Sequence, residues 1–447
     1  MGITSSKLTF PRGGIHPPGD KSRTKDEPLV ESEPPEELAV LMLQHIGSPA
    51  KPVVEKRDEV LKGQVIGKAQ GFISANIHAP VSGTVRKIEH RIHAPTGKPV
   101  PAVIIKNDGE ERWAEGCNEP QNVDDMDTEE MVDLVKEAGV VGMGGATFPA
   151  HVKLSPPPKT PVSDVILNGA ECEPKLTCDY RLMVEKTDEM VDALKLIMTI
   201  VDADNGHIGI EANKPEAIER FRTATADEPD ITVRELEVLY PQGAEQQLIT
   251  AITGREVPAG GGLPSEVGCL VHNVGTVLAI RDAICYRRPL ISRPLTVAGN
   301  AVESAGNFVE RIGTSVRHIL ERQGMRDGAN RLVMGGPMMG VAQADLDVPI
   351  IRGTSGLLLD CAQKPPEQRA CIRCGRCVER CPLGLVPSDL SIYCENEDWD
   401  GAQELELMEC KECGCCAYIC PANRRIVHLV KYGKSELAKR KRESNSD

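Results

Sequence analysis

Two cysteine runs near the C-terminus organise this chain: Cys371-Ile-Arg-Cys374-Gly-Arg-Cys377-Val-Glu-Arg-Cys381-Pro382 and Cys410-Lys-Glu-Cys413-Gly-Cys-Cys416-Ala-Tyr-Ile-Cys420-Pro421. Both have the spacing C-x2-C-x2-C-x3-C followed by proline, so the second run is an internal repeat of the first. Such short gaps let successive thiolates converge on one small object while backbone N–H groups point at the sulfurs. We therefore expect the rest of the chain to feed electrons to this module or to take electrons from it.

The repeat predicts a ferredoxin-like module with two [4Fe–4S] clusters, in which the fourth cysteine of each run ligates the other cluster. The rule gives two ligand sets: Cys371, Cys374, Cys377 and Cys420 for the first cluster, and Cys381, Cys410, Cys413 and Cys416 for the second. With every ligand a protein thiolate, the pair is expected to relay electrons rather than to bind substrate. Cys415 lies off the spacing and is interpreted as a spare thiol.

Two alternatives to iron–sulfur clusters remain open. A four-cysteine zinc site is the first, although such sites usually show two C-x2-C pairs. A disulfide framework is the second, and it suits a long chain without a secretory signal poorly.

Composition and charge limit the classes of function. With 447 residues the chain is long enough for about three domains. Its formal net charge of −14 argues against general nucleic-acid binding, and its 3% aromatic content requires aliphatic cores. No apolar run reaches the ~18–20 residues that span a bilayer, and the N-terminal segment has no apolar signal-peptide core. We expect a soluble or peripheral protein in a reducing compartment.

The N-terminal part, residues 1–115, is expected to be an extended arm followed by a β-rich domain. Clusters of β-branched residues separated by glycine and proline indicate strands over residues 50–107. The stretches Asp58–Gly67 and Ile77–Val85 resemble the barrel-sandwich hybrid of biotinyl and lipoyl domains. Ile73-Ser-Ala-Asn76 stands where such domains carry the modified lysine. We therefore predict this fold without the swinging arm.

Three further domains are expected to follow. Residues 116–290 alternate helical and strand patterns, as α/β domains do, with one long helix expected over residues 179–200. Residues 291–350 have the pattern of a small α+β unit, and residues 351–447 form the cluster domain with a basic tail. The predicted fold class is thus multidomain α+β.

A glycine-rich segment, Gly142-Met-Gly-Gly-Ala-Thr-Phe-Pro149, could leave backbone N–H groups open to a phosphate or a flavin ring. By itself it fits a tight turn without a ligand equally well. It lacks the G-x-G-x-x-G pattern and follows a helix, which disfavours a Rossmann dinucleotide site. Two polar segments at strand ends, Asn168–Pro174 and His272–Thr276, favour a ligand, because ligands of open α/β sheets bind at strand ends.

These segments resemble known proteins. Gly142–Lys153, Asn168–Pro174, Tyr240–Gln247 and Leu263–Thr276 are similar to the flavin subunit of respiratory complex I and its relatives. With the barrel-sandwich start, a β-grasp (SLBB-like) unit at residues 291–350 and the doubled cysteine run, the domain order resembles the RnfC subunit of the Rnf ion-translocating electron-transport complexes. The resemblance covers nearly the whole chain.

The resemblance implies a set of cofactor-binding residues. Four would lie at the phosphate and ribityl groups of FMN: Gly142, Gly144, Gly145 and Lys153. Three would line the flavin site: Asn168, Glu171 and Asn273. Glu173 and Glu245 match acidic positions near the nicotinamide nucleotide, and Phe148 is the nearest match to the aromatic residues that hold adenine. No catalytic acid, base or nucleophile is implied.

The resemblance also implies a function. FMN accepts a two-electron hydride and gives up single electrons, so it joins NAD(H) to iron–sulfur clusters. The expected protein is an NADH-reactive subunit of an ion-translocating ferredoxin:NAD oxidoreductase, peripheral on the cytoplasmic face of the bacterial inner membrane. Its expected partners are a ferredoxin-like RnfB subunit and integral membrane subunits. A flavin-free iron–sulfur adaptor, or the NAD-linked subunit of a soluble hydrogenase or formate dehydrogenase, are the alternatives.

Overall fold

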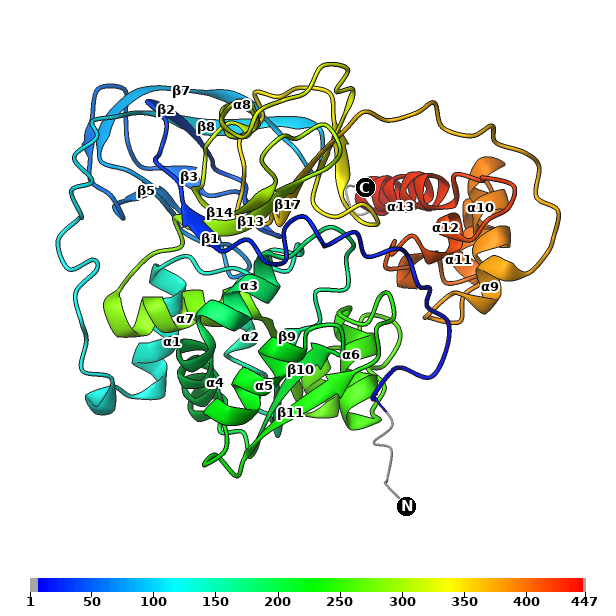
Figure 1. Cartoon of the computed structure of the whole chain (residues 1–447), viewed down its shortest axis with the longest axis horizontal. Helices are drawn as coiled ribbons and strands as arrows, with labels where there is room; N and C mark the ends of the chain where they lie inside the picture. The colour runs from blue at the N-terminus through cyan, green and yellow to red at the C-terminus, as the bar shows by residue number, and fades with distance from the viewer. Residues whose placement is uncertain (1–6, 445–447) are drawn as a thin grey trace.

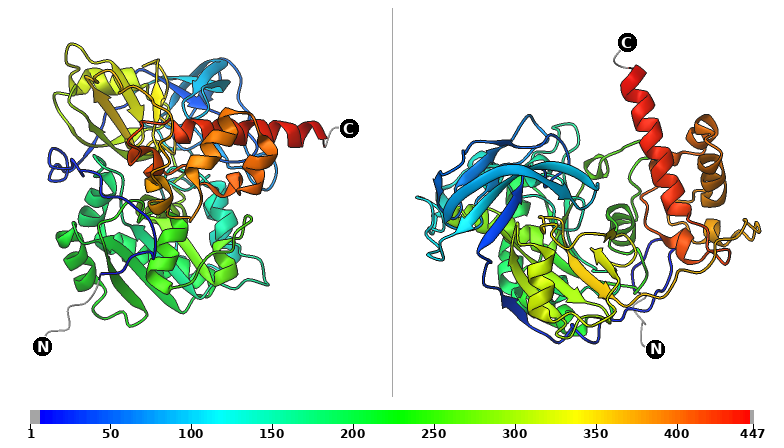
Figure 2. Two further views of the ribbon diagram at one scale, coloured as in Figure 1. Left: turned by 90° about the vertical axis from the view of Figure 1, so that its right-hand side faces the viewer. Right: turned by 90° about the horizontal axis from the view of Figure 1, so that it is seen from above.

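The computed structural model describes residues 7–444, which form four packed parts (Figure 1). Two β-rich parts lie side by side over a larger α/β part, and the cysteine-rich helices lie at one side, joined by a long connection after residue 360 (Figures 1 and 2). No helix among these residues is both long and apolar enough to cross a membrane.

The first part contains two small antiparallel sheets. One has the strand order β2 (Glu37–Leu41), β8 (Lys98–Asn107), β7 (Gly83–His93), β4 (Glu59–Val60), and the other β3 (Lys51–Pro52), β5 (Val65–Lys68), β6 (Ile77–His78). Alternate residues of these strands point into one aliphatic core that includes Leu38, Ile66 and Ile105. The two sheets thus enclose a single core, as expected for a barrel-sandwich hybrid.

The second part is a parallel sheet with the order β11 (Ile231–Leu236), β10 (Asn205–Glu211), β9 (Asp164–Gly169), β12 (Cys269–Asn273). Val165 and Leu167 face one core and Ile166 the other, because successive strand residues point to opposite faces. Six helices of this part are α1 (Thr128–Glu137), α2 (Ala150–Lys153), α4 (Thr187–Val201), α5 (Pro215–Ala224), α6 (Glu245–Thr253) and α7 (Val274–Tyr286), with 3-10 turns at Val123–Asp125 and Pro264–Val267.

The single helix expected over residues 179–200 is wrong: α3 (Cys178–Glu185) ends at Lys186 and α4 starts anew. The backbone N–H groups of Thr177 and Cys178 donate to Thr296 Oγ1 at 2.9 and 3.0 Å, which holds the start of α3 against the third part. The rest of α3, through Leu182 and Met183, packs with α4 into the core of the parallel sheet. Tertiary contacts thus override a continuous helical pattern.

The third part is a six-stranded sheet with the order β1 (Leu29–Glu31), β14 (Gly306–Arg311), β13 (Ser292–Ala298), β17 (Gly356–Asp360), β15 (Arg331–Met334), β16 (Val341–Gln343). Helix α8 (Val316–Gln323) covers its core. The sheet includes β1 from the N-terminal arm and β17, which follows residue 350. Segments from outside residues 291–350 thus complete this sheet.

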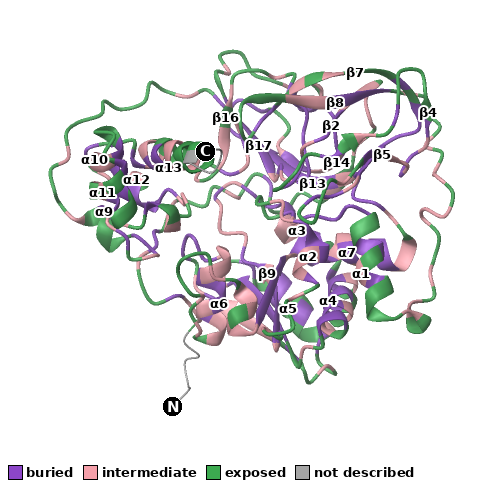
Figure 3. Ribbon diagram, turned by 180° about the vertical axis from the view of Figure 1, so that it is seen from behind, coloured by how far each residue is buried: buried purple, intermediate pink, exposed green. Residues whose placement is uncertain are grey.

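The fourth part holds the cysteine runs and five helices: α9 (Arg376–Glu379), α10 (Pro387–Glu395), α11 (Trp399–Glu404), α12 (Cys415–Tyr418) and α13 (Ile426–Ser444), with a 3-10 turn at Leu407–Glu409. The apolar sides of α10, α11 and α13 form its core. Helix α13 extends beyond the other helices (Figure 2). Outward-facing stretches of this part are largely exposed (Figure 3).

The arm before β1 connects three of the four parts. Leu8 pairs with Leu236 of β11, and Ile15 pairs with Tyr240. Between them, Gly14 N donates to Arg380 O at 3.2 Å in the cysteine-rich part. The arm then crosses the molecule to β1 (Figure 1).

Candidate functional site

The parallel sheet reverses its strand order between β9 and β12. The chain runs outward from β9 to β10 and β11, and β12 then returns to the free edge of β9. Asn168 and Asn273 are register partners at the carboxyl ends of β9 and β12. Ligands of open α/β sheets bind outside the carboxyl ends at such a reversal. The two polar segments predicted from sequence are therefore brought together there.

The glycine loop lies beside this strand end. Met143 N donates to Thr276 Oγ1 at 2.9 Å, and the Cα of Gly144 lies so close to Asn273 that a Cβ on residue 144 would be 3.5 Å from the Asn273 Cβ. Gly145 has a φ of +102°, and a Cβ there would meet no atom within 4 Å. Gly142 closes the loop by donating to Phe148 O at 2.8 Å. The exposed backbone at residues 144–146 is thus open to a ligand.

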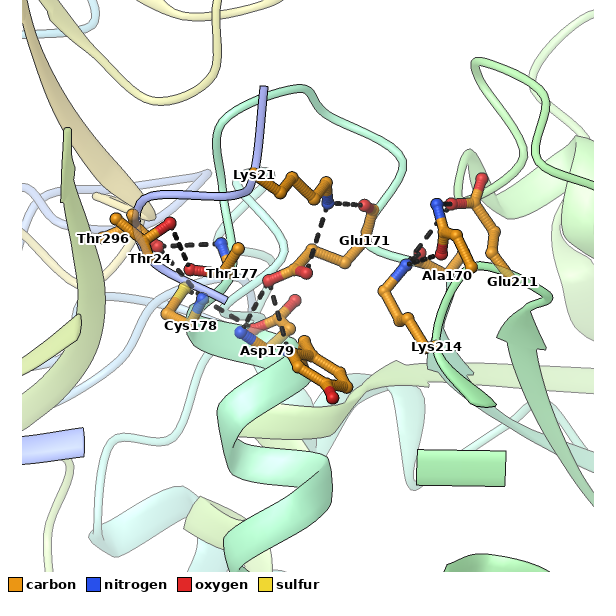
Figure 4. Close-up of polar contacts among 12 residues, drawn as sticks. Lys21, Thr24, Ala170, Glu171, Thr177, Cys178, Asp179, Glu211, Lys214 and Thr296 are labelled. Atoms are coloured by element: carbon orange, nitrogen blue, oxygen red, sulfur yellow. Dashed lines mark hydrogen bonds and ion pairs between the residues drawn. The ribbon is translucent and has the colours of Figure 1, made fainter. Parts of the chain in front are cut away.

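A carboxylate pair lies between the strand ends and α3. Asn273 Nδ2 donates to Asp179 Oδ2 at 2.7 Å, and Asp179 N donates to Glu171 Oε1 at 2.8 Å. Burial and the nearby Glu171 charge raise the pKa of Asp179 to about 6. Lys21 of the arm donates to the Glu171 carbonyl at 2.6 Å and to its carboxylate at 3.3 Å (Figure 4). A residue far away in sequence thus supplies the counter-charge.

A second lysine supports the same strand end from the other side. Lys214 is buried, and its Nζ donates to Ala170 O at 2.6 Å and to Glu211 Oε2 at 3.3 Å (Figure 4). Burial lowers the pKa of Lys214, and the Glu211 carboxylate partly opposes this effect. These contacts fix the backbone turn that carries Glu171.

Lys153 and Glu245 form an ion pair at the carboxyl side of the sheet. Lys153 Nζ lies 2.5 Å from Glu245 Oε1 and donates to Val271 O at 3.1 Å. Their side chains are 27% and 38% exposed, so both can reach a bound molecule. Next to them, His272 is buried with Nε2 unpartnered within the described part of the chain, and burial lowers its pKa to about 3. An unsatisfied buried polar atom at this position favours a polar ligand.

The Glu173 side chain is directed toward the third part. Its two carboxylate oxygens accept from the backbone N–H groups of Met338 at 3.0 Å and Met339 at 2.8 Å. Burial raises the pKa of Glu173 to about 7, although these two hydrogen bonds favour the charged form. Glu173 therefore ties the end of β9 to a turn of the third part.

The cysteine runs surround two separate cavities. One is lined by Cys371, Cys374, Cys377 and Cys420, and the other by Cys381, Cys410, Cys413 and Cys416 together with Cys415. Apart from Cys415, the cysteines of each cavity are those of one crossed set expected from spacing. All sixteen cysteines of the chain are free thiols. Within residues 7–444 no three Cys, His, Asp or Glu side chains lie close enough to hold a single metal ion, whereas a cavity lined by at least four thiols suits a larger inorganic cluster.

Both cysteine loops have the same backbone conformation at an offset of 39 residues. Arg373 and Glu412 have φ of +54° and +57°, and Gly375 and Gly414 have φ of +75° and +86°. The N–H groups of Arg373 and Glu412 each donate to the preceding cysteine sulfur, Cys371 or Cys410, at 3.4 Å. Backbone N–H groups thus point at sulfur in both loops.

The second cysteine loop packs against the α/β part. Tyr240 Oη donates to Cys413 O at 2.7 Å, and the Cys415 thiol lies 3.8 Å from Tyr240 O. Tyr240 and Cys415 share a small buried cluster with Ile15, and Cys172 of the Asn168–Pro174 segment packs against it. The spare thiol Cys415 therefore serves as packing between the cavity and the strand end.

Sequence reasoning missed several residues of this region. Asp179 was counted only as a helix residue, although an acidic residue in the first turn of a helix after a polar strand end could have been noted. Lys21 and Met338 come from segments far away in sequence, and no local pattern points to them; Tyr240 begins the segment Tyr240–Gln247 that resembles the flavin subunit, but nothing in that segment predicts its contact with Cys413. Of the expected residues, Glu173 alone has both side-chain oxygens bound to backbone of the third part.

Comparisons with known proteins agree with these features. Residues 135–282 match the family described as the Nuo51 FMN-binding domain, and residues 8–110 match the RnfC barrel sandwich hybrid domain. Both matches confirm predictions made from sequence. A chain of an NAD+-reducing [NiFe]-hydrogenase superposes with a TM-score of 0.49 and 16% identity over 73% of this chain and 68% of that one, and we draw nothing from so distant a likeness.

Three relatives, all RnfC subunits, are similar over almost the whole chain. That of the proton-translocating ferredoxin:NAD(+) oxidoreductase complex of Clostridium ljungdahlii is 45% identical, with 95% of this chain and 93% of that protein aligned. That of the Na(+)-translocating complex of Acetobacterium woodii is 42% identical over 97% and 98%. That of the ion-translocating oxidoreductase complex of Rhodobacter capsulatus is 41% identical over 96% and 83%. The chain belongs to the family of RnfC subunits of the ion-translocating ferredoxin:NAD+ oxidoreductase (Rnf) complexes.

Proposed function

We propose that this chain binds FMN and NAD(H) at the carboxyl ends of β9 and β12 and relays electrons through two [4Fe–4S] clusters. FMN accepts or gives a hydride, which carries two electrons, and exchanges single electrons with clusters. The observation that carries the proposal is the meeting of the glycine loop, Asn168 and Asn273 at the reversal of strand order.

The flavin would be held by backbone and by neutral side chains. The exposed backbone at Gly144 and Gly145 suits phosphate oxygens, Gly142 would hold the loop in place through its hydrogen bond to Phe148 O, and Asn168 and Asn273 line the adjacent strand ends. Lys153, whose Nζ donates to Val271 O of β12, is a partly exposed cation at this edge, and it would favour a reduced, negatively charged ring. Glu171 would act through its contacts with Asp179 and Lys21, which keep the wall of the site rigid.

Glu245 and Glu173 are the acidic candidates for the nucleotide. Glu245 is partly exposed and paired with Lys153, so it can exchange that partner for a ribose hydroxyl or an amide of the ligand. Glu173 accepts two backbone hydrogen bonds and would reach a nucleotide only if the Met338–Met339 turn moved. We therefore expect the larger effect on NADH affinity from Glu245.

The contacts suggest an order for the relay. The second cluster set, with Cys413 and Cys381, packs against Tyr240 and the arm, close to the strand end that carries Cys172. The first set, with Cys371 and Cys374, lies farther out. Electrons would pass between the flavin site and the second cluster, and then between the second cluster and the first.

Membership in the family places the chain in a multi-subunit complex. We infer that the chain is peripheral at the cytoplasmic face of the inner membrane, and that it exchanges electrons with a ferredoxin-like RnfB subunit and with integral membrane subunits. The names of two relatives give different coupling ions, proton and Na+, at similar identity to this chain. The coupling ion is therefore not assigned.

The test is an anaerobic absorption spectrum of the purified chain before and after NADH, with iron, sulfide and zinc analysis. We expect flavin absorbance that NADH bleaches, and about eight iron and eight sulfide per chain. Lys153→Ala and Asn273→Ala should slow bleaching, whereas Lys159→Ala, an exposed lysine on the loop after α2, should not. Iron–sulfur protein that never contains flavin would support the adaptor alternative, and zinc alone would exclude the relay.

A further inference from the structure

The two cysteine loops carry opposite charge. Residues 364–380, around the first three cysteines, contain five cations and two carboxylates, a net charge of +3. The equivalent residues 403–419 contain one cation and four carboxylates, a net charge of −3. The cationic copy is unusual in a chain of net charge −14.

The cations of the first loop are exposed and unpaired. Arg369, Arg373 and Arg376 are all exposed, and within residues 7–444 their guanidinium groups make no hydrogen bond or ion pair. In the second loop, Glu412 takes the place of Arg373, and it pairs with Lys434 at 2.9 Å and Lys431 at 3.8 Å. The charge of the second loop is thus partly neutralised within the fold, and that of the first loop is free to act on another molecule.

Both loops expose apolar side chains, with Met408 and Tyr418 in the second, but those of the first are flanked in sequence by unpaired arginines. Ile372, in the middle of the first loop, is 67% exposed, and Val378 of α9 is 37% exposed. A Cβ on Gly375 would meet no atom within 4 Å, whereas a Cβ on the equivalent Gly414 would lie 3.2 Å from Met338 O. An exposed isoleucine that lines a four-thiol cavity together with Arg373, with further exposed arginines at positions 369 and 376, has the composition of a docking surface.

We propose that this face, formed by Arg369, Ile372, Arg373, Arg376 and Val378, binds an acidic electron-carrier protein that exchanges single electrons with the first cluster. The proposal rests on the assignment of clusters made above. In one encounter the reduced carrier loses one electron and the first cluster gains it, so no other reactant is needed. The carboxylates of the same segment, Glu367 and Glu379, are outnumbered by the arginines.

Electrostatic complementarity is the reason to choose an acidic protein. Opposite charge around a small apolar contact raises the association rate by about 10- to 1000-fold at low salt, and the effect falls as ions screen it. Ile372 and Arg373 line the first cavity, and Arg369 and Arg376 lie within four residues of them in the chain, so a carrier docked there would bring its own centre close to the cluster.

The experiment uses the full-length chain with its clusters and a purified acidic two-cluster ferredoxin as the probe. Binding of oxidised ferredoxin is measured by calorimetry, and oxidation of reduced ferredoxin by stopped-flow absorbance, each over a series of salt concentrations. The double variant Arg373→Glu with Arg376→Glu should weaken binding and slow transfer by about tenfold or more at low salt, with a smaller difference at high salt. Arg373→Lys with Arg376→Lys should retain most of both.

The matched control is Lys56→Glu with Lys98→Glu, which makes the same change in net charge at exposed positions of the barrel-sandwich part. Equal losses in the control and the arginine pair, or no loss in the arginine pair, would overturn the proposal. So would a loss of binding to anionic phosphatidylglycerol vesicles with ferredoxin transfer unchanged, since that result would make the face a membrane contact. Bleaching of the flavin by NADH is measured separately in each variant, because it tests the proposed function without the carrier protein.

Discussion

The two cysteine loops have one backbone conformation and two kinds of surroundings. Positive φ at Arg373 and Glu412, and the sulfur-directed N–H groups, recur at equivalent positions. Around the second loop, however, Tyr240 and Ile15 of the arm pack against Cys415, whereas residues 372–374 of the first loop are exposed. Local sequence therefore determines what a loop can ligate, and tertiary contacts determine where its electrons can go.

The strongest test of this comparison removes one ligand from each set. Cys413→Ala and Cys374→Ala should each lower the iron content from about eight to about four per chain. After reduction with dithionite and removal of the excess, NAD+ should rapidly reoxidise the remaining cluster in Cys374→Ala. In Cys413→Ala the remaining first cluster should stay reduced, because the cluster that contacts the α/β part is lost.

Stopped-flow absorbance and electron paramagnetic resonance follow both variants. Equal reoxidation in the two would show that the surroundings of the loops do not set the order of transfer. Complete loss of iron in either variant would show that neither cluster assembles without the other. The order of electron transfer would then be measured by a redox titration that reduces one cluster of the natural chain at a time.

A smaller effect is expected from the arm, which contacts Cys381 of the second ligand set at the end of the first cysteine run. Gly13 has a φ of +73°, and a Cβ there would lie 2.6 Å from the backbone of Cys381. Gly13→Ala should therefore destabilise this contact by about 3 kcal/mol, from the left-handed backbone and from overpacking. Hydrogen exchange at the amides of Gly14 and Ile15, which donate to Arg380 O and Tyr240 O, would report the loss.

Gly19→Ala is the control on the same arm, since a Cβ there meets nothing within 4 Å and its φ is not positive. Faster exchange in Gly13→Ala alone would support the arm as a packing element that holds Cys381 of the second ligand set. Similar exchange in both variants would mean that the arm adapts to the extra atom at little cost.

The third test uses pH. Glu173 holds the turn of Met338, whose carbonyl covers Gly414 of the second loop. Its pKa is raised by burial from 4.5 to about 7, so the folded state holds a proton there that the unfolded state has lost. This contribution to stability is complete below pH 4.5 and is lost as pH rises through 7, by an amount on the order of 2 kcal/mol.

The amide of Glu173→Gln does not titrate. The free energy of unfolding of this variant should therefore fall less steeply than that of the natural chain between pH 5 and 8. Denaturant unfolding at a series of pH values measures the difference. Glu379→Gln, on the exposed helix of the first loop, is the control. Parallel profiles for the natural chain and Glu173→Gln would show that Glu173 does not contribute to the pH dependence of the free energy of unfolding.

Sequence was sufficient where the chemistry is local. The cysteine spacing predicts two crossed ligand sets, and the cysteines of each set line one cavity, because their relative positions depend mainly on adjacent residues. The strand ends at Asn168 and Asn273 were also found, and the parallel register places them side by side. What could not be predicted depends on distant segments: Lys21 beside Glu171, Tyr240 on Cys413, and the break between α3 and α4. Each needs a contact across parts of the fold that no local pattern encodes.

The smallest expected effect concerns a single hydroxyl group. Tyr240 is almost fully buried, and its Oη donates to the Cys413 carbonyl at 2.7 Å. Tyr240→Phe keeps the ring but leaves that carbonyl unpaired, which should cost about 1 kcal/mol. Tyr432→Phe removes a hydroxyl that donates to Glu397 at an exposed position of α13, so its cost should be smaller. Denaturant unfolding compares the two, and equal costs would mean that burial of the second loop adds nothing to the strength of its contact with the α/β part.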